Sequence, residues 1–266
     1  MIDLHCHILP GVDDGPATMA EAVAMCRAAA ADGIHTIVTT PHFNPGRFTW
    51  SADEQQASIT ALQCEIDAAG IELTLLPGAE IAFSPELPQL LKSGTHLTIN
   101  RAPYFLLEFR PQAVPANIEQ FLSTLMDAGY LPVIAHPERN SWFTHRHDVL
   151  TSLVRRGALL QITADSLLGR LGADVRTFSR QLLSNNLVHI IASDAHNSSD
   201  RPALLSGAVS AAAELVGAEL AAAMVTANPL AVINGTRLTP PERAGYLTPE
   251  PSSRHSWFRR LLGASP

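Results

Sequence analysis

The chain opens with Met1-Ile-Asp-Leu-His5-Cys6-His7-Ile-Leu-Pro10-Gly-Val-Asp-Asp14-Gly15, which joins a short strand pattern to several side chains that can bind metal. Successive side chains of a strand point to opposite faces, so His5 and His7 project together while Cys6 points into the packing behind them. The two imidazoles can therefore converge on one ion. A lone His-x-His pair is about as often a solvated surface pair, so the assignment depends on ligands elsewhere in the chain.

Further apolar, β-branched segments predict strands, and each ends close to a histidine or a carboxylate. We expect these strands at residues 34–40, 71–76, 104–109, 131–135 and 187–192. The residues near their ends, with Asp14 from the loop after the first strand, are His42, Glu80, Glu108, His136, Asp194 and His196. In α/β barrels the C-terminal ends of the strands form one face, where residues distant in sequence can meet.

Together with His5 and His7, this set contains five histidines and four carboxylates. A single ion takes only about four to six ligands, so nine residues suit two or three ions that share a bridging carboxylate. Each residue alone could instead be a helix cap or a core residue. Their recurrence at strand ends predicts a metal cluster assembled by the whole fold.

These motifs, in order, resemble the polymerase and histidinol phosphatase (PHP) superfamily, and within it the manganese-dependent protein-tyrosine phosphatases of bacterial capsule and exopolysaccharide loci, the CpsB/CapC type. The motifs are Thr-Thr-Pro-His42, Pro-Gly-Ala-Glu80, Leu-Leu-Glu108-Phe, Ala-His136-Pro-Glu-Arg-Asn and Ala-Ser-Asp194-Ala-His196, and the likeness covers about residues 1–236. The resemblance implies three manganese ions. It implies one ion on His5, His7, Glu80 and Asp194, a second on Glu80, Glu108 and His136, and a third on Asp14, His42 and His196.

Such a cluster favours phosphate ester hydrolysis, because bridged divalent ions generate hydroxide near neutral pH and neutralise phosphoryl oxygens. Arg139 and Arg201 follow His136 and His196 closely and are predicted to hold the phosphoryl oxygens bidentately. A surface salt bridge is the alternative role for each arginine. We count Asp14 and Glu108, besides the two arginines, as candidate catalytic residues.

Other hydrolytic mechanisms lack their motifs. A cysteine-dependent tyrosine phosphatase needs Cys-x5-Arg, but the residues six positions after the three cysteines are Val12, Asp32 and Gly70. Neither Gly-x-Ser-x-Gly nor a phosphate-binding Gly-x4-Gly-Lys-Ser/Thr loop occurs. The odd cysteine number without Cys-x-x-Cys spacing predicts neither a disulfide framework nor a zinc finger.

The fold class predicted from these patterns is α/β, with seven strands near residues 2, 36, 73, 106, 133, 160 and 189 forming a distorted (β/α)7 barrel, as the resemblance also implies. Thr18 with Glu21, and Ser51 with Glu54, are candidate capping boxes, and a glycine lies near each expected helix end. We expect one phosphatase domain at residues 1–236 and a Pro/Ser/Arg-rich tail at 237–266.

The formal net charge of −7 is unevenly distributed, since residues 1–236 carry 13 basic and 23 acidic groups and the tail five and two. The acidic residues 1–236 would repel nucleic acid, so we do not expect nucleic acid as a partner.

The sequence has no charged-then-apolar leader, so we expect no secretory signal. Glu214 and Glu219 interrupt the Ala-rich stretch, which predicts a buried or amphipathic helix rather than a membrane span. We therefore expect a cytoplasmic protein without a transmembrane segment.

The resemblance implies a phosphotyrosine-protein phosphatase that acts on a bacterial tyrosine kinase controlling polysaccharide synthesis. The alternatives are a PHP phosphatase for a small phosphomonoester such as histidinol phosphate, an amidohydrolase, and a non-catalytic binding module of the polysaccharide machinery. Against an amidohydrolase, the only lysine is Lys92, and it does not lie at a strand end where it could become a carbamylated bridging ligand. Imidazole and carboxylate ligands are also compatible with iron or zinc, and a homo-oligomer is left open.

Some histidines are not assigned to the site. His35 and His189 lie in apolar strand patterns and are expected to be hydrogen-bonded core residues. His145 and His147 form a second His-x-His with no preceding strand, so we expect them at the surface. Three aromatic residues after His42, namely Phe43, Phe48 and Trp50, are candidates for lining a cleft that accepts a tyrosine ring.

Overall fold

Buried apolar segments form parallel strands whose ends carry the candidate ligands. The computed structural model describes residues 1–94, 97–110 and 114–238, so the predicted tail lies outside the described residues from 239 onward. Within these ranges there are nine strands: β1 (Ile2–Cys6), β2 (Thr36–Thr39), β3 (His42–Phe43), β4 (Thr74–Pro77), β5 (Glu80–Ala82), β6 (Tyr104–Glu108), β7 (Leu131–Ala135), β8 (Leu159–Thr163) and β9 (Ile190–Ala192). The pairings between these strands are parallel, and they form a sheet β1-β2-β4 and a sheet β3-β5-β6-β7-β8-β9.

The α/β class is confirmed, but the expected number of strands was wrong because two of the seven strands are interrupted. Between β2 and β3 lies Pro41, which has no backbone N–H for a ladder hydrogen bond. Between β4 and β5 lies Gly78, where a Cβ would come within 2.7 Å of Val38 Cγ1. After each interruption the chain enters the second sheet, where His42 pairs in register with Glu80.

The first and last strands are joined beyond β9. Cys6 forms an isolated parallel bridge with Ala195, and the backbone N–H of His7 donates to the Ala195 carbonyl at 2.9 Å. The backbone N–H of Asp194 donates to the His5 carbonyl at 2.8 Å. These contacts bring the first and the last of the candidate ligands, about 190 residues apart in sequence, into one place.

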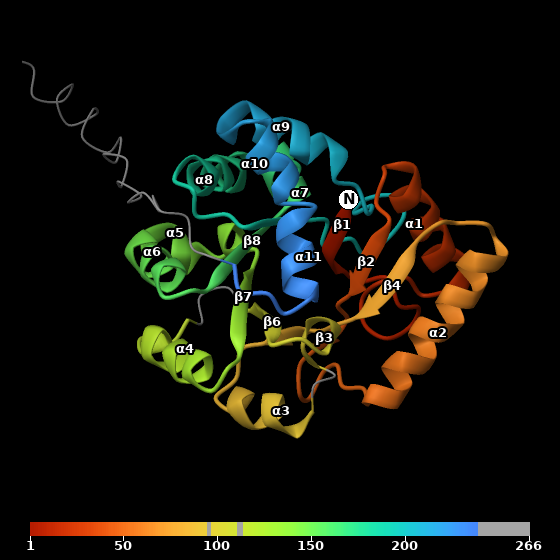
Figure 1. Cartoon of the computed structure of the whole chain (residues 1–266), viewed down its shortest axis with the longest axis horizontal. Coiled ribbons are helices and arrows are strands. Elements are labelled where there is room, and N and C mark those ends of the chain that lie inside the picture. Colours follow the sequence, from red (N-terminus) through yellow and green to blue (C-terminus); the bar gives the residue numbers. More distant parts are fainter. Residues whose placement is uncertain (95–96, 111–113, 239–266) are drawn as a thin grey trace, which may run out of the picture.

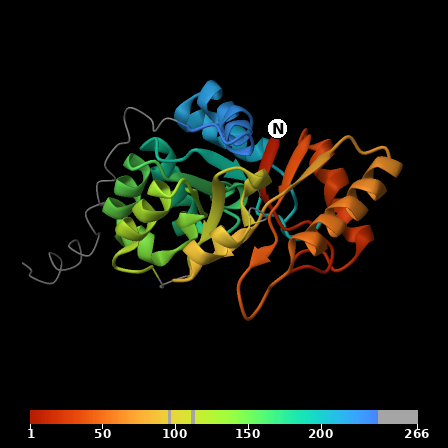
Figure 2. The ribbon, with the colours of Figure 1, turned by 60° about the horizontal axis from the view of Figure 1, so that its bottom comes forward.

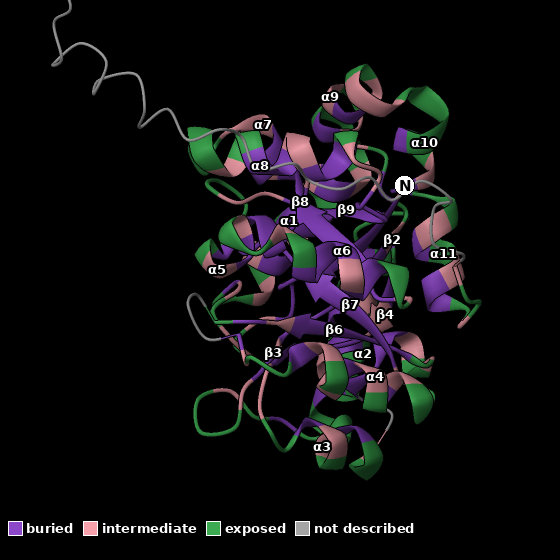
Figure 3. Ribbon diagram, turned by 90° about the vertical axis from the view of Figure 1, so that its left-hand side faces the viewer, coloured by how far each residue is buried: buried purple, intermediate pink, exposed green. Residues whose placement is uncertain are grey.

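Helices surround the strands (Figure 1). They are α1 (Met19–Ala31), α2 (Ala52–Ala68), α3 (Leu87–Ser93), α4 (Ile118–Asp127), α5 (Ser141–His145), α6 (His147–Arg155), α7 (Ala164–Leu168), α8 (Ala173–Ser184), α9 (Ser206–Val216), α10 (Ala218–Ala223) and α11 (Ala227–Ile233), with 3-10 turns η2 (Ile99–Arg101) and η3 (Pro137–Arg139). In Figure 2 the α1 and α2 helices lie with the three-stranded sheet at one end of the molecule. The strands themselves are almost entirely buried (Figure 3).

Local sequence determines where the two long N-terminal helices begin and end. Ser51 and Glu54 form a complete capping box before α2, whereas at α1 the Thr18 side chain accepts from the Glu21 N–H and the reciprocal bond is absent. Gly33 and Gly70 follow the last turns with φ of +88° and +65°, which glycine adopts without strain. The apolar face of α2, with Ile59, Leu62 and Ile66 buried, packs into the main core.

The Ala-rich segment folds as α9 and α10. Ala208, Ala212 and Ala221 are buried, whereas Leu220 is 53% exposed. The segment is thus a pair of short, partly buried helices, as its interrupting glutamates predicted. Among the described helices none combines the length and the apolar character that crossing a membrane requires.

Candidate metal centre

The structure brings all nine predicted ligands into one cluster at the strand ends. His5 lies on β1 and His7 directly after it; Glu108 ends β6, and His136 follows β7. Asp194 and His196 follow β9, and Asp14 lies in the loop before α1. His42 and Glu80 differ from expectation in that they begin the short strands β3 and β5, because the strand interruptions place them there.

Glu80 lies at the centre and is 1% exposed. Its Oε1 is 2.8 Å from His136 Nε2, and its Oε2 is 2.9 Å from His42 Nδ1 and 3.3 Å from His7 Nε2. Burial alone would raise the pKa of Glu80, but the neighbouring His5, the hydrogen bond from His136 and the close approach of His42 hold that pKa well below its usual range. Glu80 is therefore an ionised carboxylate in contact with several imidazoles, as a bridging ligand would be.

Asp194 connects the histidines to the arginines. Its Oδ1 is 3.4 Å from His5 Nε2 and 3.5 Å from His7 Nε2, while its Oδ2 accepts from Arg139 at 2.5 Å and from Arg201 at 2.7 Å. Asp194 has φ +53° and His136 φ +29°, a left-handed region that non-glycine residues seldom adopt. Backbone strain of this kind is concentrated at functional sites.

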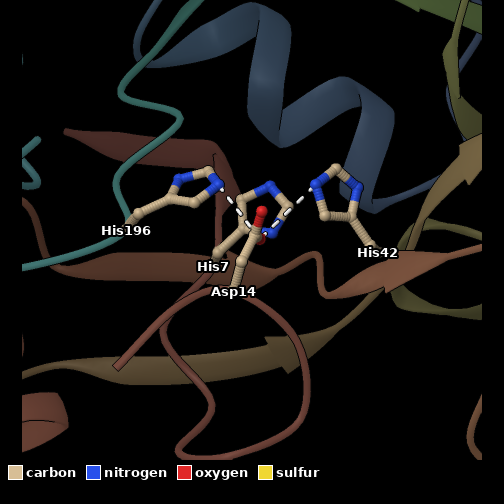
Figure 4. A group of neighbouring side chains, drawn as sticks. All are labelled: His7, Asp14, His42 and His196. Carbon is tan, nitrogen blue, oxygen red and sulfur yellow. Dashed lines mark ion pairs between the residues drawn. The ribbon is translucent and has the colours of Figure 1, made fainter. Parts of the chain in front are cut away.

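A second group lies around Asp14, as Figure 4 shows. Asp14 Oδ1 is 3.5 Å from His42 Nε2 and 3.3 Å from His196 Nε2. The His7 ring lies between them, with centroid separations of 4.5 Å to His42 and 4.1 Å to His196. The hydrogen bond from His196 is the main reason that the pKa of Asp14 lies far below its usual value. Asp14 is 44% exposed while His7 is buried, so this group opens towards solvent.

The donor set fits divalent cations. Ligand atoms within 4.8 Å of one another form four overlapping groups: His7, Asp14, His42, His196; His5, His7, Glu80; His5, His136, Asp194; and His42, Glu80, Glu108. His5 Nε2 and His7 Nε2 face each other at 3.1 Å, and Glu80 Oε2 makes short contacts without hydrogen-bond geometry. Converging lone pairs of this kind suit ions better than protons. These groups divide the residues differently from the resemblance, which assigned His136 with Glu80 and Glu108.

Three buried residues that the sequence analysis missed support these side chains. Asp13 Oδ2 accepts from His7 Nδ1 at 2.6 Å and from the His42 N–H at 2.8 Å. Gln161 Oε1 lies 3.0 Å from His5 Nδ1, and Asp3 accepts from the Ser193 N–H at 3.0 Å and from its hydroxyl. Two of them could have been recognised from their sequence positions, because Asp13 is next to Asp14 and Asp3 lies on the same strand face as His5 and His7.

A cavity of about 680 Å³ opens above the cluster. It is lined by Asp14, His42, Asn44, Pro45, Gly46, Arg47, Phe48, Glu80, Glu108, Arg110, His136, Arg139, Asp194, His196 and Arg201. Arg139 and Arg201 are 34% and 32% exposed, and both line this cavity. They form ion pairs, but with a buried candidate ligand and at the cavity wall.

The other histidines and aromatic residues separate clearly from this cluster. His189 is buried and accepts a hydrogen bond from the Leu160 N–H, as expected, whereas His35 is exposed and the core prediction for it was wrong. Phe48 lines the cavity and stacks on His42 at 5.7 Å. Phe43 and Trp50 pack against each other in the core and do not line it.

Comparisons with known proteins agree with this geometry. A family model described as "Capsular polysaccharide synthesis, CpsB/CapC" matches residues 1–234. Tyrosine-protein phosphatase YwqE of Bacillus subtilis (strain 168) is 42% identical over 197 residues, which cover 74% of this chain and 78% of YwqE. A crystal structure from work on YwqE and on CpsB of Streptococcus pneumoniae, described as metal-dependent tyrosine phosphatases, superposes with a TM-score of 0.86 at 38% identity and covers 92% of this chain and 100% of that chain.

A more distant solved structure shares the fold alone. Histidinol phosphate phosphatase of Lactococcus lactis superposes with a TM-score of 0.52 at 15% identity and covers 81% of this chain and 92% of that chain. The family model spans nearly all the described residues and every residue of the cluster. The chain therefore belongs to the CpsB/CapC family of capsular polysaccharide synthesis.

Proposed function

We propose that this protein is a metal-dependent phosphotyrosine-protein phosphatase that holds three manganese ions. The observation that carries the proposal is the convergence of five imidazoles and four carboxylates beneath a cavity with two arginines in its wall. The ions would be held by His5, His7, Asp14, His42, Glu80, Glu108, His136, Asp194 and His196. When bound, divalent ions supply Lewis acidity towards phosphoryl oxygens and lower the pKa of water.

The residues of the chain would perform the remaining tasks. Arg139 and Arg201 would orient the phosphoryl group, because a guanidinium offers paired N–H donors to two oxygens. Asp194 Oδ2 keeps both guanidiniums in the cavity wall before substrate arrives. Asp14 and Glu108, which are 44% and 26% exposed, lie at the solvent side of the cluster, where an attacking or departing oxygen would exchange its proton.

The substrate proposal rests on the relatives. Relatives such as YwqE are named tyrosine-protein phosphatases, and the family model is described by capsular polysaccharide synthesis. We infer a phosphotyrosine protein as substrate, and a bacterial tyrosine kinase of a polysaccharide pathway as the specific one. The likeness to histidinol phosphate phosphatase, at 15% identity, gives no support for that small substrate.

We further infer that the two sheets together form a distorted seven-stranded barrel within one domain at residues 1–236. Joining β2 to β3 and β4 to β5 leaves seven strand positions, and the Cys6–Ala195 bridge supports contact between the first and the last. We propose a cytoplasmic location, with the acidic body excluding nucleic acid as a substrate.

Phosphate release from three substrates tests the proposed function. A phosphotyrosine peptide, a matched phosphoserine peptide and histidinol phosphate are compared with manganese-loaded protein and with chelated protein. We expect kcat/KM for phosphotyrosine to exceed the other two by about tenfold or more, a selectivity that pocket contacts can supply. Preferred hydrolysis of histidinol phosphate would make the protein a small-molecule phosphatase, and no metal-dependent release at all would make it a binding module.

A further inference from the structure

The cavity contains two further arginines that the catalytic proposal does not use. Arg47 and Arg110 line the same cavity as Arg139 and Arg201 but are exposed. Arg139 and Arg201, the inner pair, form ion pairs with Asp194. Neither Arg47 nor Arg110 forms an ion pair within the part of the chain that the structure describes. The protein is acidic overall, with a formal net charge of −7, yet Arg47 and Arg110 place two positive charges at the exposed rim of this cavity.

Arg47 is carried by an ordered loop that is fixed to the candidate metal centre. Asn44 and Phe48 exchange backbone hydrogen bonds of 2.8 and 3.0 Å, which close the loop between β3 and α2 seen extending from the body in Figure 2. Phe48 stacks on His42 at 5.7 Å, and the Trp50 indole N–H donates to the His42 carbonyl at 3.0 Å. The guanidinium of Arg47 lies over the Phe48 ring at 4.8 Å.

Arg110 reaches the same loop from β6. Its Nη2 donates to Asn44 Oδ1 at 3.3 Å, and this acceptor is neutral, so among the described residues the positive charge of Arg110 has no carboxylate partner. Asn140, next to Arg139, donates to the Arg110 carbonyl at 3.1 Å and so fixes the backbone there. Arg47 and Arg110, the rim pair, are thereby linked to the segments that carry His42 and Arg139, and no carboxylate within residues 1–94, 97–110 and 114–238 neutralises them.

We propose that Arg47 and Arg110 form a second anion subsite, which binds an acidic side chain flanking the phosphotyrosine of a peptide substrate. This inference rests on the proposed phosphatase function and specifies its substrate class. The phosphoryl group would occupy the inner pair, and the tyrosine ring would lie near Phe48. A carboxylate or a second phosphate on the same peptide would then bind Arg47 and Arg110, because both anions can accept two hydrogen bonds from one guanidinium group.

Four peptides test the subsite. One carries phosphotyrosine with neutral flanking residues, and the others carry glutamate, phosphoserine or lysine at the same flanking positions. We expect kcat/KM to rise about three- to tenfold with glutamate, mainly through a lower KM, as exposed ion pairs contribute modestly, and to rise further with phosphoserine. The preference should weaken as potassium chloride is raised from about 0.05 to about 0.5 M.

Variants assign the preference to these residues. The double variant Arg47→Gln/Arg110→Gln should reduce the glutamate-to-neutral ratio to within about twofold, and Arg47→Glu/Arg110→Glu should favour the lysine peptide instead. Arg27→Gln, an exposed arginine of α1 outside the cavity, is the matched control and should keep both activity and preference. A wild-type protein without preference, or a double glutamine variant that retains it, would overturn the subsite.

A binding measurement keeps this result separate from the proposed function. The Kd of non-hydrolysable phosphonate analogues of the neutral and glutamate peptides is measured by calorimetry on the wild type and the double glutamine variant. Tighter binding of the glutamate analogue to the wild type alone supports the subsite even when no peptide is hydrolysed, in which case the phosphatase function fails. Equal binding of both analogues with normal turnover removes the subsite and leaves the phosphatase function intact.

Discussion

The chain contains two His-x-His sequences, and they have different structures. His5 and His7 are fully buried at the end of β1, and each faces Glu80 and Asp194 at 3.3 to 3.5 Å. His145 ends α5, is exposed, and contacts the Ser141 carbonyl, while His147 begins α6 and stacks on Phe178 at 5.1 Å. Within the described residues no carboxylate pairs with the second motif. The strand end and its carboxylate partners, rather than the motif, make a candidate metal site.

The largest expected difference follows from replacing each motif. His5→Ala/His7→Ala should lose bound metal and reduce kcat/KM by about 10³-fold or more, because these side chains belong to shared ligand groups. His145→Ala/His147→Ala should stay within about tenfold of the wild type, since both only line a neighbouring cavity of about 850 Å³ next to Arg139. Metal analysis and phosphate release measure both effects. Equal losses in the two variants would remove the distinction.

Two arginines, Arg139 and Arg201, lie near His5 and His7 through their ion pairs with Asp194. Arg139→Ala and Arg201→Ala should each reduce kcat by on the order of 10²-fold while the metal content stays intact, because a guanidinium has no lone pair for an ion. Arg→Lys should restore part of the rate, since a point charge cannot make the two-pronged contact. Near-normal turnover of both alanine variants with full metal content would limit these residues to the salt bridge with Asp194.

Asp13 gives the first motif a partner that the second lacks. It accepts from His7 Nδ1 at 2.6 Å, which directs Nε2 towards the cluster, whereas His145 Nδ1 has only a backbone carbonyl and a hydroxyl nearby. Asp13→Asn should therefore weaken metal affinity about 10- to 100-fold, the usual effect of losing such an outer partner. Metal titration by calorimetry measures it. An unchanged affinity would show that the ring of His7 is oriented by packing alone.

His189 tests the other end of the strands, because it directly precedes β9 and belongs to none of the candidate ligand groups. Burial lowers its pKa to about 4, so the folded state binds its proton more weakly than the unfolded state, whose pKa is about 6.5. Its contribution to stability is complete above pH ~6.5 and decreases by up to about 3 kcal/mol as pH falls towards 4. His189→Asn, whose oxygen can accept from the Leu160 N–H, should reduce this acid dependence.

Urea denaturation of chelated wild-type and His189→Asn protein at several pH values measures the effect. Chelation removes bound metal from the comparison, and the other histidines are the same in both proteins. The free-energy difference between the two should change with pH between about 6.5 and 4. If it stays constant, protonation of His189 does not contribute to acid unfolding.

The structure brings the nine candidate ligands of the sequence together, because most of them lie at or shortly after the end of an apolar strand. The expected strands did not include the interruptions at Pro41 and Gly78, and the one at Gly78 involves the close approach of Val38 from a neighbouring strand. Asp3 and Gln161 were also missed from the sequence, since their partners Ser193 and His5 lie more than 150 residues away. His35 was misassigned because periodicity marks a strand but not the point where it emerges from the core.

Metal stoichiometry tests the central claim most directly. The wild-type protein is loaded with manganese, freed of excess ion, and analysed for metal per chain by mass spectrometry alongside its activity, with His42→Ala and His145→Ala treated in parallel. We expect about three ions per wild-type chain, three for His145→Ala and fewer for His42→Ala, with activity lost on chelation. Two ions per chain with full activity, unchanged by His42→Ala, would contradict the site around Asp14, His42 and His196.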